Sequence, residues 1–580
     1  MHEQTEPPMS PRVWMSLIGG IAGLAAWILF EVLPDTLDNQ RLFLWIASAT
    51  GGFFTVLLAL LGPLKARPAV AVAGVLALTA AALLFWNNGR YLQFDDQFEH
   101  GLAPLAWSLL LLIGAPFGAA LVERKVRDYA YLFDTAWGIV VRYAAAWVFV
   151  GLFWALLFLS DALLSIVGIT LIEQLIDEEP VPYVLTGLVL GLALSVAQEL
   201  RSYVSPYLLL RLLRLLLPMV LLVVTVFIAA LPTRGLSQLF GDFSAAAILM
   251  GVAIAGVTLI TSALDRDEED AIASRYMRLA TKALALLLPI LGGLAIWAIW
   301  LRVSEYGWTP ERLAAAIASG FVMSYAVLYA LALLRGTEWT AHIRQANIFM
   351  AISALVVAGL WLSPVFNAEK ISAETQLTRY LDGKIKADTF PVWELQNTWG
   401  KPGQAVIEKL NALPKEDHIK ILASLERAKS QSRWQFTENQ TAETTRNLSS
   451  RITPHVKIWP DGITLAPMAF ADTYSFYLEK WAEICPQQTT TPCTLVHGPF
   501  GAQGEDKALF IVPGQDTHAG IFLMHLTDGK YGAANSISIP GQGRHLSAEQ
   551  IEQIATGGFR IGPSSRQALW VGDLEISPEN

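Results

Sequence analysis

The residues best suited to covalent chemistry are the only two cysteines, Cys485 and Cys493, which enclose the polar, proline-flanked segment ICPQQTTTPCTL. Two thiols eight positions apart match neither a redox CxxC pair nor a four-ligand zinc pattern. In an oxidising compartment this spacing is typical of a disulfide, which would remove loop entropy worth about 2.5 kcal/mol from the unfolded state. We therefore predict a disulfide. In a reducing compartment the same residues would be two ordinary thiols.

Acid–base and metal chemistry find little support in the sequence. Six histidines follow residue 400, but they stand singly in expected loops or strands, and only His518 and His525 are close in sequence. The chain lacks the GxSxG, Walker, HExxH and glycine-rich dinucleotide motifs. We therefore predict no catalytic residue, no metal site and no cofactor, and we consider an enzyme less favoured than a non-enzymatic protein.

Charged residues are rare within the apolar segments. Arg142 lies near one end of the fifth apolar run, and Glu199 closes the sixth run at the same expected membrane face. The two residues are candidates for an ion pair at the membrane edge, although both could be solvated separately. No Asp, Glu, Lys or His falls near the middle of a run, which argues against a proton pump built on a relay of carboxylates.

Prolines and glycines mark the apolar runs in another way. Pro116, Pro218 and Pro289 interrupt three of them, and interrupted helices often line substrate sites in transporters. The alternative is a simple kink that a neighbouring helix compensates. Small residues also recur at four-residue spacing, which permits close approach of two helices; these are Gly19 and Gly23, Gly187 and Gly191, and Ala247, Gly251 and Ala255.

The elements that carry these residues are long apolar runs. The chain has 580 residues, of which 53% are hydrophobic and 16% charged, and its mean hydropathy is +0.43. Soluble domains contain about 25% charged residues, whereas a helix that crosses a ~30 Å hydrocarbon core needs about 20 apolar residues. We predict about eleven membrane-spanning helices, over residues 13–33, 42–62, 69–86, 103–122, 137–160, 181–199, 209–231, 244–264, 281–302, 311–334 and 346–363.

Lys and Arg residues fall mainly on alternate connections. Fifteen lie in the connections on the side of the N-terminus and five lie on the other side. The positive-inside rule therefore predicts a cytoplasmic tail over residues 1–12 and a transmembrane domain over 13–363. With an odd number of spans, the chain after residue 363 lies on the opposite face, which is the periplasm if the membrane is the bacterial inner (plasma) membrane. A merged or missed helix would place it in the cytoplasm instead.

The connection 161–179 has no Lys or Arg and ends in an acidic run. Its helical period predicts a helix that lies on the membrane surface or enters the bilayer and returns. It is either an acidic docking edge or pathway mouth, or a plain connector packed by its Leu and Ile face. Four basic residues after the last span are candidates to contact this acidic run: Lys370, Arg379, Lys384 and Lys386.

The C-terminal part changes from helices to strands. Residues 364–450 have helical apolar spacing and are predicted to form a helical periplasmic linker region. From 451 to 580, VKIWPDGITL predicts a hairpin, and CTLVHG, KALFIVPG, AGIFLMHLTDGKYG and ALWVGDLEI predict further strands. With a helix near 470–484 and a short helix capped by Ser547 and Gln550, this region is predicted to be a soluble α+β domain with an antiparallel sheet.

Two blocks of the sequence resemble a family. FDTAWGIVVRYAAAWVFVGLFWALLFLSDALLSIVGI and NAEKISAETQLTRYLDGKIKADTFPVWELQNTWGKPGQAVIEKL are similar to blocks of a domain-of-unknown-function family of bacterial polytopic inner-membrane proteins. The second block is the more specific, with Ile371, Ser372, Gln376, Arg379, Gly383, Gly400 and Gly403 in order. The resemblance implies an inner-membrane location and a soluble C-terminal module, and it supplies no activity and no catalytic residues.

Three classes of function remain. The favoured hypothesis is a non-enzymatic cell-envelope protein whose helices anchor a periplasmic module that binds a partner or senses envelope state. The alternative is a transporter or lipid-handling permease that uses the proline-interrupted helices, and an enzyme is third. The expected partners are the lipid bilayer and a periplasmic or envelope protein. Nucleic acid is not expected, because no long basic block occurs, and the oligomeric state is left open.

Overall fold

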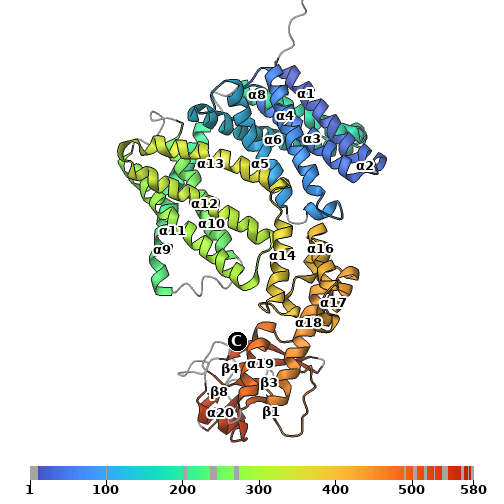
Figure 1. Cartoon of the computed structure of the whole chain (residues 1–580), viewed down its shortest axis with the longest axis vertical. Coiled ribbons are helices and arrows are strands. Elements are labelled where there is room, and N and C mark those ends of the chain that lie inside the picture. Colours follow the sequence, from blue (N-terminus) through green and yellow to red (C-terminus); the bar gives the residue numbers. More distant parts are fainter. Residues whose placement is uncertain are drawn as a thin grey trace, which may run out of the picture. The chain divides into compact units, whose positions relative to one another are not determined.

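The fold is taken from a computed structural model of the whole chain (Figure 1). It comprises two compact units, residues 1–422 and residues 423–580, which are treated separately below. The structure describes residues 11–98, 101–199, 206–234, 244–266, 274–488, 491–500, 506–514, 519–527, 529–537, 546–563, 567–572 and 574–576.

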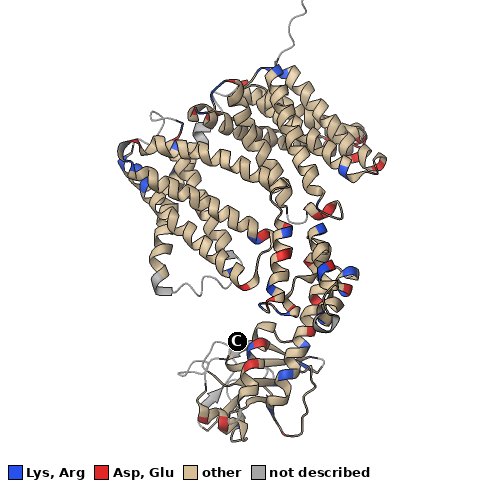
Figure 2. Cartoon of the chain, in the orientation of Figure 1, with Lys and Arg blue, Asp and Glu red and all other residues tan. Residues whose placement is uncertain are grey.

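Within the described residues, the first unit contains eleven helices long and apolar enough to cross a membrane, as the sequence predicts. Figure 2 shows their ribbons almost free of charged residues. The helices indicate a membrane protein. The first of them is extended by a π-helical turn, Ile28–Val32, and by α2 (Leu33–Thr36). The eleven are α1 (Pro11–Trp27), α3 (Gln40–Leu60), α4 (Ala66–Asn88), α5 (Leu102–Val122), α6 (Tyr129–Ile166), α8 (Pro180–Glu199), α9 (Pro206–Arg234), α10 (Ser244–Leu264), α11 (Arg275–Tyr306), α12 (Pro310–Leu334) and α13 (Trp339–Leu362).

These helices form two bundles, each with its own apolar core (Figure 1). The first bundle consists of α1, α3, α4, α5, α6 and α8, and its core is rich in Leu and Ala. The second bundle consists of α9 to α13, with Tyr329 fully buried in its core. Helix α13 also packs on α5, so the second bundle contacts the first.

The closest helix pair in the first bundle is α1 and α8, which run antiparallel along the glycines singled out in the sequence. A Cβ atom added to Gly19 would lie 2.0 Å from the carbonyl oxygen of Gly187, and one added to Gly187 would lie 2.1 Å from that of Gly19. Gly23 and Gly191 are equally close to backbone atoms of the partner helix. Only glycine permits this approach. By contrast, a Cβ at Gly251 would meet nothing within 4 Å, so the similar pattern on α10 does not mark a helix contact there.

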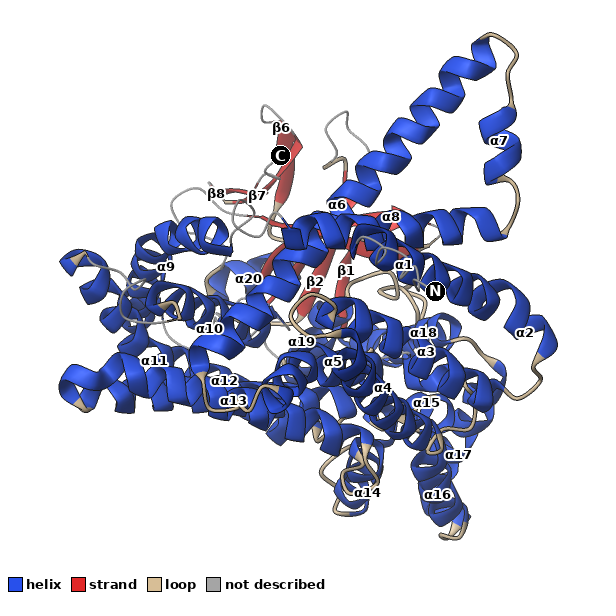
Figure 3. Ribbon diagram, turned by 90° about the horizontal axis from the view of Figure 1, so that it is seen from above, coloured by secondary structure: helices blue, strands red, loops and turns tan. Residues whose placement is uncertain are grey.

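Helix α6 is longer than its predicted span. At 38 residues it measures about 57 Å, nearly twice the ~30 Å hydrocarbon core. It continues through the first part of the 161–179 connection, and the short α7 (Leu171–Ile176) and α8 lead the chain back (Figure 3). The helix thus extends beyond both ends of the predicted span 137–160, and it continues without a break into the connection whose helical period the sequence indicates.

After α13 the chain remains part of the first unit through a set of short helices. These are α14 (Ala368–Leu381), α15 (Val392–Asn397) and α16 (Gly400–Asn411), which we call the collar. Helix α17 (Lys415–Ser430) contains the boundary between the two units. That boundary lies inside the helical region 364–450 of the sequence analysis.

The second unit contains α18 (Arg433–Ile452), α19 (Ser475–Ile484), α20 (Ala548–Ala555) and two sheets. One apolar core joins α18 and α19 to one face of the larger sheet, and another joins α20 and the smaller sheet to its opposite face. Sheet order follows the sequence, β1 to β5 and β6 to β8. The strands are β1 (Val456–Trp459), β2 (Cys493–Gly498), β3 (Lys507–Val512), β4 (Gly520–Thr527), β5 (Lys530–Ile537), β6 (Arg560–Pro563), β7 (Gln567–Val571) and β8 (Leu574–Ile576).

The α+β fold of the C-terminal unit and the capping box of Ser547 and Gln550 are confirmed, but the first predicted hairpin is wrong. Strand β1 ends before Pro460 and pairs in parallel with β2, with Val456 opposite Cys493. The larger sheet is therefore mixed, although β2 to β5 pair antiparallel. A parallel partner must come from a distant segment, which a local turn signal does not reveal.

Candidate functional site

A buried ion pair joins the collar to the connection after α4. Arg90 Nη1 lies 3.7 Å from Glu369 Oε2, and each side chain is only 8% exposed. Tyr91 donates its hydroxyl hydrogen to Glu369 Oε1 over 2.5 Å. Arg90 also donates to the carbonyl oxygens of Ser363 and Phe366, at the end of α13. The four contacts fix the start of α14 against the end of α4.

Burial and the nearby charges shift the pKa values of Tyr91 and Arg90 in this cluster. Burial raises the pKa of Tyr91, and the negative charge of Glu369 raises it further. Tyr91 therefore stays protonated and remains a hydrogen-bond donor at physiological pH. Burial lowers the pKa of Arg90, while the Glu369 carboxylate opposes that effect. A guanidinium nevertheless remains charged in proteins, so the cluster is a fixed structural contact.

Helix α16 contacts the same connection through its first residues. The backbone N–H of Lys401 donates to the Arg90 carbonyl over 2.8 Å, and Lys401 Nζ donates to the Gly89 carbonyl over 2.8 Å. Gly400 adopts φ +54°, and a Cβ there would lie 2.6 Å from the Arg90 carbonyl oxygen. Glycine is required at position 400 because the backbone has a positive φ and because the Arg90 carbonyl leaves no space for a Cβ atom.

Helix α14 also holds the connection between α11 and α12. Gln376 Nε2 donates to the carbonyls of Tyr306 and Trp308 over 2.9 and 3.0 Å. Arg379 Nη2 donates to the carbonyls of Ser304 and Glu305 over 3.1 and 2.8 Å. The collar thus ties together one connection from each bundle, and we call this end of the helices the collar face.

Two residues that the sequence placed against the acidic run 173–179 have other partners. Arg379 contacts the last turn of α11, and Lys384 pairs with Asp382 over 3.0 Å. The predicted docking is therefore wrong for both. The cause is the short connection after α13, which leaves α14 beside the ends of α4 and α11.

A second polar site joins the bundles at the opposite end of the helices, which we call the far face. Asp265 is fully buried with φ +51° and forms an ion pair with Arg214. Arg344 donates to the Leu264 carbonyl over 2.7 Å. Between the bundles, Arg266 Nη1 lies 3.3 Å from Asp134 Oδ2 on α6.

A chain of hydrogen bonds accompanies this far-face site. Tyr329 on α12 donates to Asn347 Oδ1 over 2.6 Å, and Asn347 Nδ2 donates to the Tyr129 hydroxyl oxygen over 3.1 Å. The hydroxyls of Thr261 and Tyr329 lie 3.0 Å apart. Helices α10, α12, α13 and α6 are thereby connected. Sequence analysis missed this network, because uncharged Tyr, Asn and Thr give no signal in a hydropathy profile.

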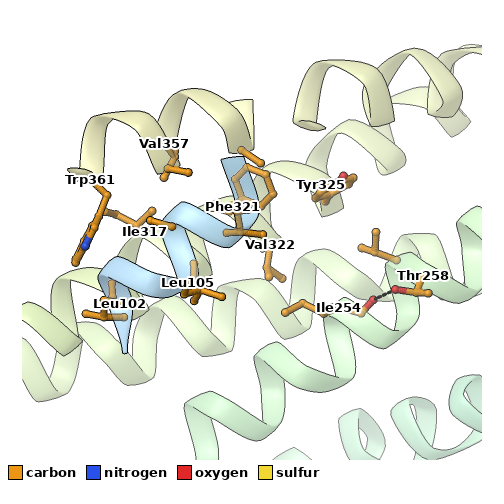
Figure 4. A pocket seen from close by; sticks show the side chains of 17 residues that line it. Leu102, Leu105, Ile254, Thr258, Ile317, Phe321, Val322, Tyr325, Val357 and Trp361 are labelled. Atoms are coloured by element: carbon orange, nitrogen blue, oxygen red, sulfur yellow. Dashed lines mark hydrogen bonds between the residues drawn. The ribbon is translucent and has the colours of Figure 1, made fainter. Parts of the chain in front are cut away.

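An apolar cavity of about 450 Å³ lies between the two bundles (Figure 4). Helix α5 of the first bundle forms one wall, and α10, α12 and α13 of the second bundle form the others. Among the described residues, no charged side chain lines it. Its polar side-chain groups are the Trp361 indole N–H and the hydroxyls of Thr258 and Tyr325, and the Thr258 hydroxyl donates to the Ile254 carbonyl over 2.9 Å within α10. The wall includes Leu105, Ile254, Ile317, Phe321, Val357 and Trp361.

The three predicted helix-break positions lie away from this cavity wall. Pro116 is buried in α5, and Pro289 is partly buried in α11. Pro218 is exposed on α9. All three are accommodated inside continuous helices. The small residues of α12 and α13, rather than prolines, leave the space between the bundles.

Arg142 and Glu199, the candidate ion pair, have different partners. Glu199 accepts hydrogen bonds from Arg12 Nε over 3.0 and 2.9 Å. Arg142 donates to Gln198 Oε1 over 3.0 Å and to the Ala59 carbonyl over 2.7 Å. Helical geometry explains the difference, since neighbouring residues of α8 point in directions about 100° apart.

The predicted disulfide is present in the second unit. Cys485 and Cys493 are bonded, with Cα atoms 5.5 Å apart, and both are fully buried. The bond connects the end of α19 to the start of β2. Across the described part of the chain, no group of three or more His, Cys, Asp or Glu side chains is arranged to hold a metal ion.

Comparison with protein families matches residues 25–394 to the domain of unknown function DUF4153. The chain belongs to this family. The DUF4153 match extends from α1 through α14 into α15, and thus includes the contacts of Arg90, Glu369, Gln376 and Arg379. No curated protein and no solved structure matches the chain. The DUF4153 match thus joins the membrane helices to α14 and the start of α15, and it ends before α16, which belongs to the same compact unit of the structure.

Proposed function

We propose that this integral membrane protein binds the acyl chain of a membrane lipid in the cavity between its two helix bundles. The observation that carries the proposal is the apolar wall of that cavity. Its volume, about 450 Å³, falls within the range of small-molecule sites, roughly 300 to 1,000 Å³. The hypothesis corresponds to the lipid-handling alternative, without its assumption that broken helices line the site.

The chemistry of the wall selects the ligand class. Binding a polar cargo in apolar surroundings costs free energy unless hydrogen bonds replace those made with water. The Thr258 hydroxyl already donates within its own helix, and among the described residues the wall adds only the Tyr325 hydroxyl and the Trp361 N–H as polar groups and no charge. An acyl chain requires neither hydrogen bonds nor charge from the wall, and the surrounding bilayer supplies acyl chains at high concentration.

A photoreactive fatty acid with a diazirine on its chain tests this function. In the purified full chain, we expect crosslinks on α5, α12 and α13 at cavity residues, mapped by mass spectrometry. Ala318→Trp and Ala354→Trp fill the cavity and should remove most of these crosslinks. Val75→Trp is the matched control, because Val75 is 67% exposed on α4. Equal labelling of all variants, spread over exposed faces, would reject the acyl-chain site.

A second candidate function is a cell-envelope anchor that displays the C-terminal unit to a periplasmic partner. The second unit supports it, because that unit has two apolar cores and its own disulfide. Expressed with an export signal, residues 423–580 should fold alone and show a near-ultraviolet circular dichroism spectrum of packed aromatics. An unfolded fragment would argue against an autonomous module. We also infer a bacterial inner-membrane location with a periplasmic C-terminal unit, which the charge bias of the connections supports.

A further inference from the structure

A second cavity, of about 340 Å³, lies in the collar between α14 and α16. Four basic residues line it, namely Arg90, Lys370, Lys401 and Lys409, together with one carboxylate, Glu374. The cavity is thus rich in positive charge, whereas the apolar cavity between the bundles has none.

The positive charge is only partly neutralised within the protein. Glu369 pairs with Arg90, and Lys401 Nζ donates to the Gly89 carbonyl. Among the described residues, neither Lys370 nor Lys409 has an ion-pair partner, and both are exposed. Two ammonium groups at this cavity are therefore available to an anion from outside the chain.

The depth of the cavity indicates which anion it meets. Arg90 lies two residues beyond Asn88, where the third candidate span ends, and Lys370 lies eight residues beyond Leu362, where the last span ends. Trp86, 58% exposed in the last turn of α4, is placed as an interfacial aromatic residue. Lysines at this depth reach the phosphate layer of a bilayer, where each contributes about 1 kcal/mol of attraction to anionic lipids.

We propose that the basic cavity of the collar binds a phosphate group, supplied by the headgroup of an anionic phospholipid. Lys370 and Lys409 pair with the phosphate oxygens, and Glu374 at the rim opposes the bound charge. The proposal does not rest on the acyl-chain cavity, which lies between other helices. A free phosphate ion offers the same oxygens and is the alternative source.

Native mass spectrometry of the full chain in detergent provides the test, with phosphatidylglycerol, phosphatidylethanolamine and inorganic phosphate as probes. We expect tighter binding of phosphatidylglycerol than of phosphatidylethanolamine. Lys370→Gln combined with Lys409→Gln should weaken phosphatidylglycerol binding about thirtyfold, the size expected for losing two interfacial lysines. Lys384→Gln combined with Lys386→Gln removes the same charge outside the cavity and should leave binding unchanged.

Two further variants separate a lost site from a lost fold. Glu374→Gln should strengthen phosphatidylglycerol binding, and misfolding does not produce such a gain. Lys370→Arg combined with Lys409→Arg keeps both positive charges and should retain phosphatidylglycerol binding. If inorganic phosphate competes with phosphatidylglycerol at equal concentration, free phosphate is the source; if it does not, the headgroup is. Equal binding by the cavity and control double variants, or no gain in Glu374→Gln, would overturn the proposal.

Discussion

Arg90 and Glu369 are charged side chains that the fold removes almost completely from water. Sequence reasoning gave them no role, because a single Arg after one span and a Glu after another look like ordinary connection residues. The neighbouring Gln376 and Gly400 stood out only through a family resemblance, and Arg379 stood out through the resemblance and as a basic residue expected near the acidic run. Their contacts supply the physical reason, since each of the three touches backbone at the end of a membrane helix or in the connection after it.

The buried pair leads to a stability prediction. Glu369→Ala leaves Arg90 without its carboxylate and should destabilise the first unit by about 3 to 5 kcal/mol. Replacing both residues, as Arg90→Met with Glu369→Leu, should recover much of that loss. Thermal unfolding of the detergent-solubilised chain measures both. Glu443→Ala removes one partner of an exposed pair with Arg427, worth about 0 to 1 kcal/mol, and is the control. Equal losses in Glu369→Ala and Glu443→Ala would contradict the prediction.

His497 on β2 leads to a prediction about pH. Its Nε2 lies 2.7 Å from the Tyr531 hydroxyl oxygen. Burial lowers the pKa of His497, and the nearby Asp506 carboxylate opposes this shift more weakly. The unfolded chain therefore binds a proton more readily than the folded one. The stability contribution is complete above pH ~6.5, the ordinary pKa of histidine, and is lost as the pH falls through the lowered pKa.

Urea unfolding of the oxidised fragment 423–580 between pH 7.5 and 5 measures this dependence. The free energy of unfolding should fall with pH, and His497→Gln should make the curve flatter. His455→Gln serves as the control, because His455 is exposed and its substitution should leave the dependence of the unfolding free energy on pH unchanged. Identical slopes for the parent and His497→Gln would show that another group is responsible.

At the scale of elements, the α1–α8 pair shows what small-residue patterns do and do not establish. Sequence reasoning identified Gly19, Gly23, Gly187 and Gly191 as candidates for close approach, and the structure brings these two sets together. The same pattern at Gly251 meets no partner. A four-residue repeat defines a helix face, but only packing decides which face meets another backbone.

This contrast gives a matched pair of substitutions. Gly187→Ala places a methyl group 2.1 Å from the Gly19 carbonyl oxygen, so α1 and α8 must separate. We expect a loss of about 1 to 3 kcal/mol, as for overpacked cores. Gly251→Ala adds the same atom in open space and should be neutral or slightly stabilising, because alanine favours helix. The melting temperatures of the two variants in detergent test this contrast. A melting temperature of Gly251→Ala below that of Gly187→Ala would refute the packing argument.

At the scale of the whole molecule, the sequence predicted the membrane helices well because their length is set by the bilayer. Most strands of the second unit were also predicted from local signals, whereas β6 (Arg560–Pro563) was missed and β1 was predicted with the wrong partner. The β1–β2 pairing, the collar contacts and the cavity were missed for a common reason. Each joins segments far apart in the chain, and hydropathy, turns and spacing are local signals.

The charge bias of the connections predicts how the whole molecule is oriented. A reporter active only in the periplasm should be active when fused after Asn580 and silent when fused after Lys65. A cytoplasmic reporter at the same two positions should show the opposite activities. Activity of the periplasmic reporter at Lys65 would invert the topology and would place the disulfide in a reducing compartment, where it is not expected to persist.

The separation of Tyr91 and Glu369 along the chain also sets the interval between their synthesis on the ribosome. The two residues are 278 positions apart. At about 5 to 20 residues per second, a ribosome needs on the order of 15 to 60 s to pass from the first to the second. During that interval the Arg90 guanidinium has no carboxylate from the collar. A chain that stops before α14 never gains this carboxylate, so the contacts of the membrane domain are complete only after Glu369 of the collar has been synthesised.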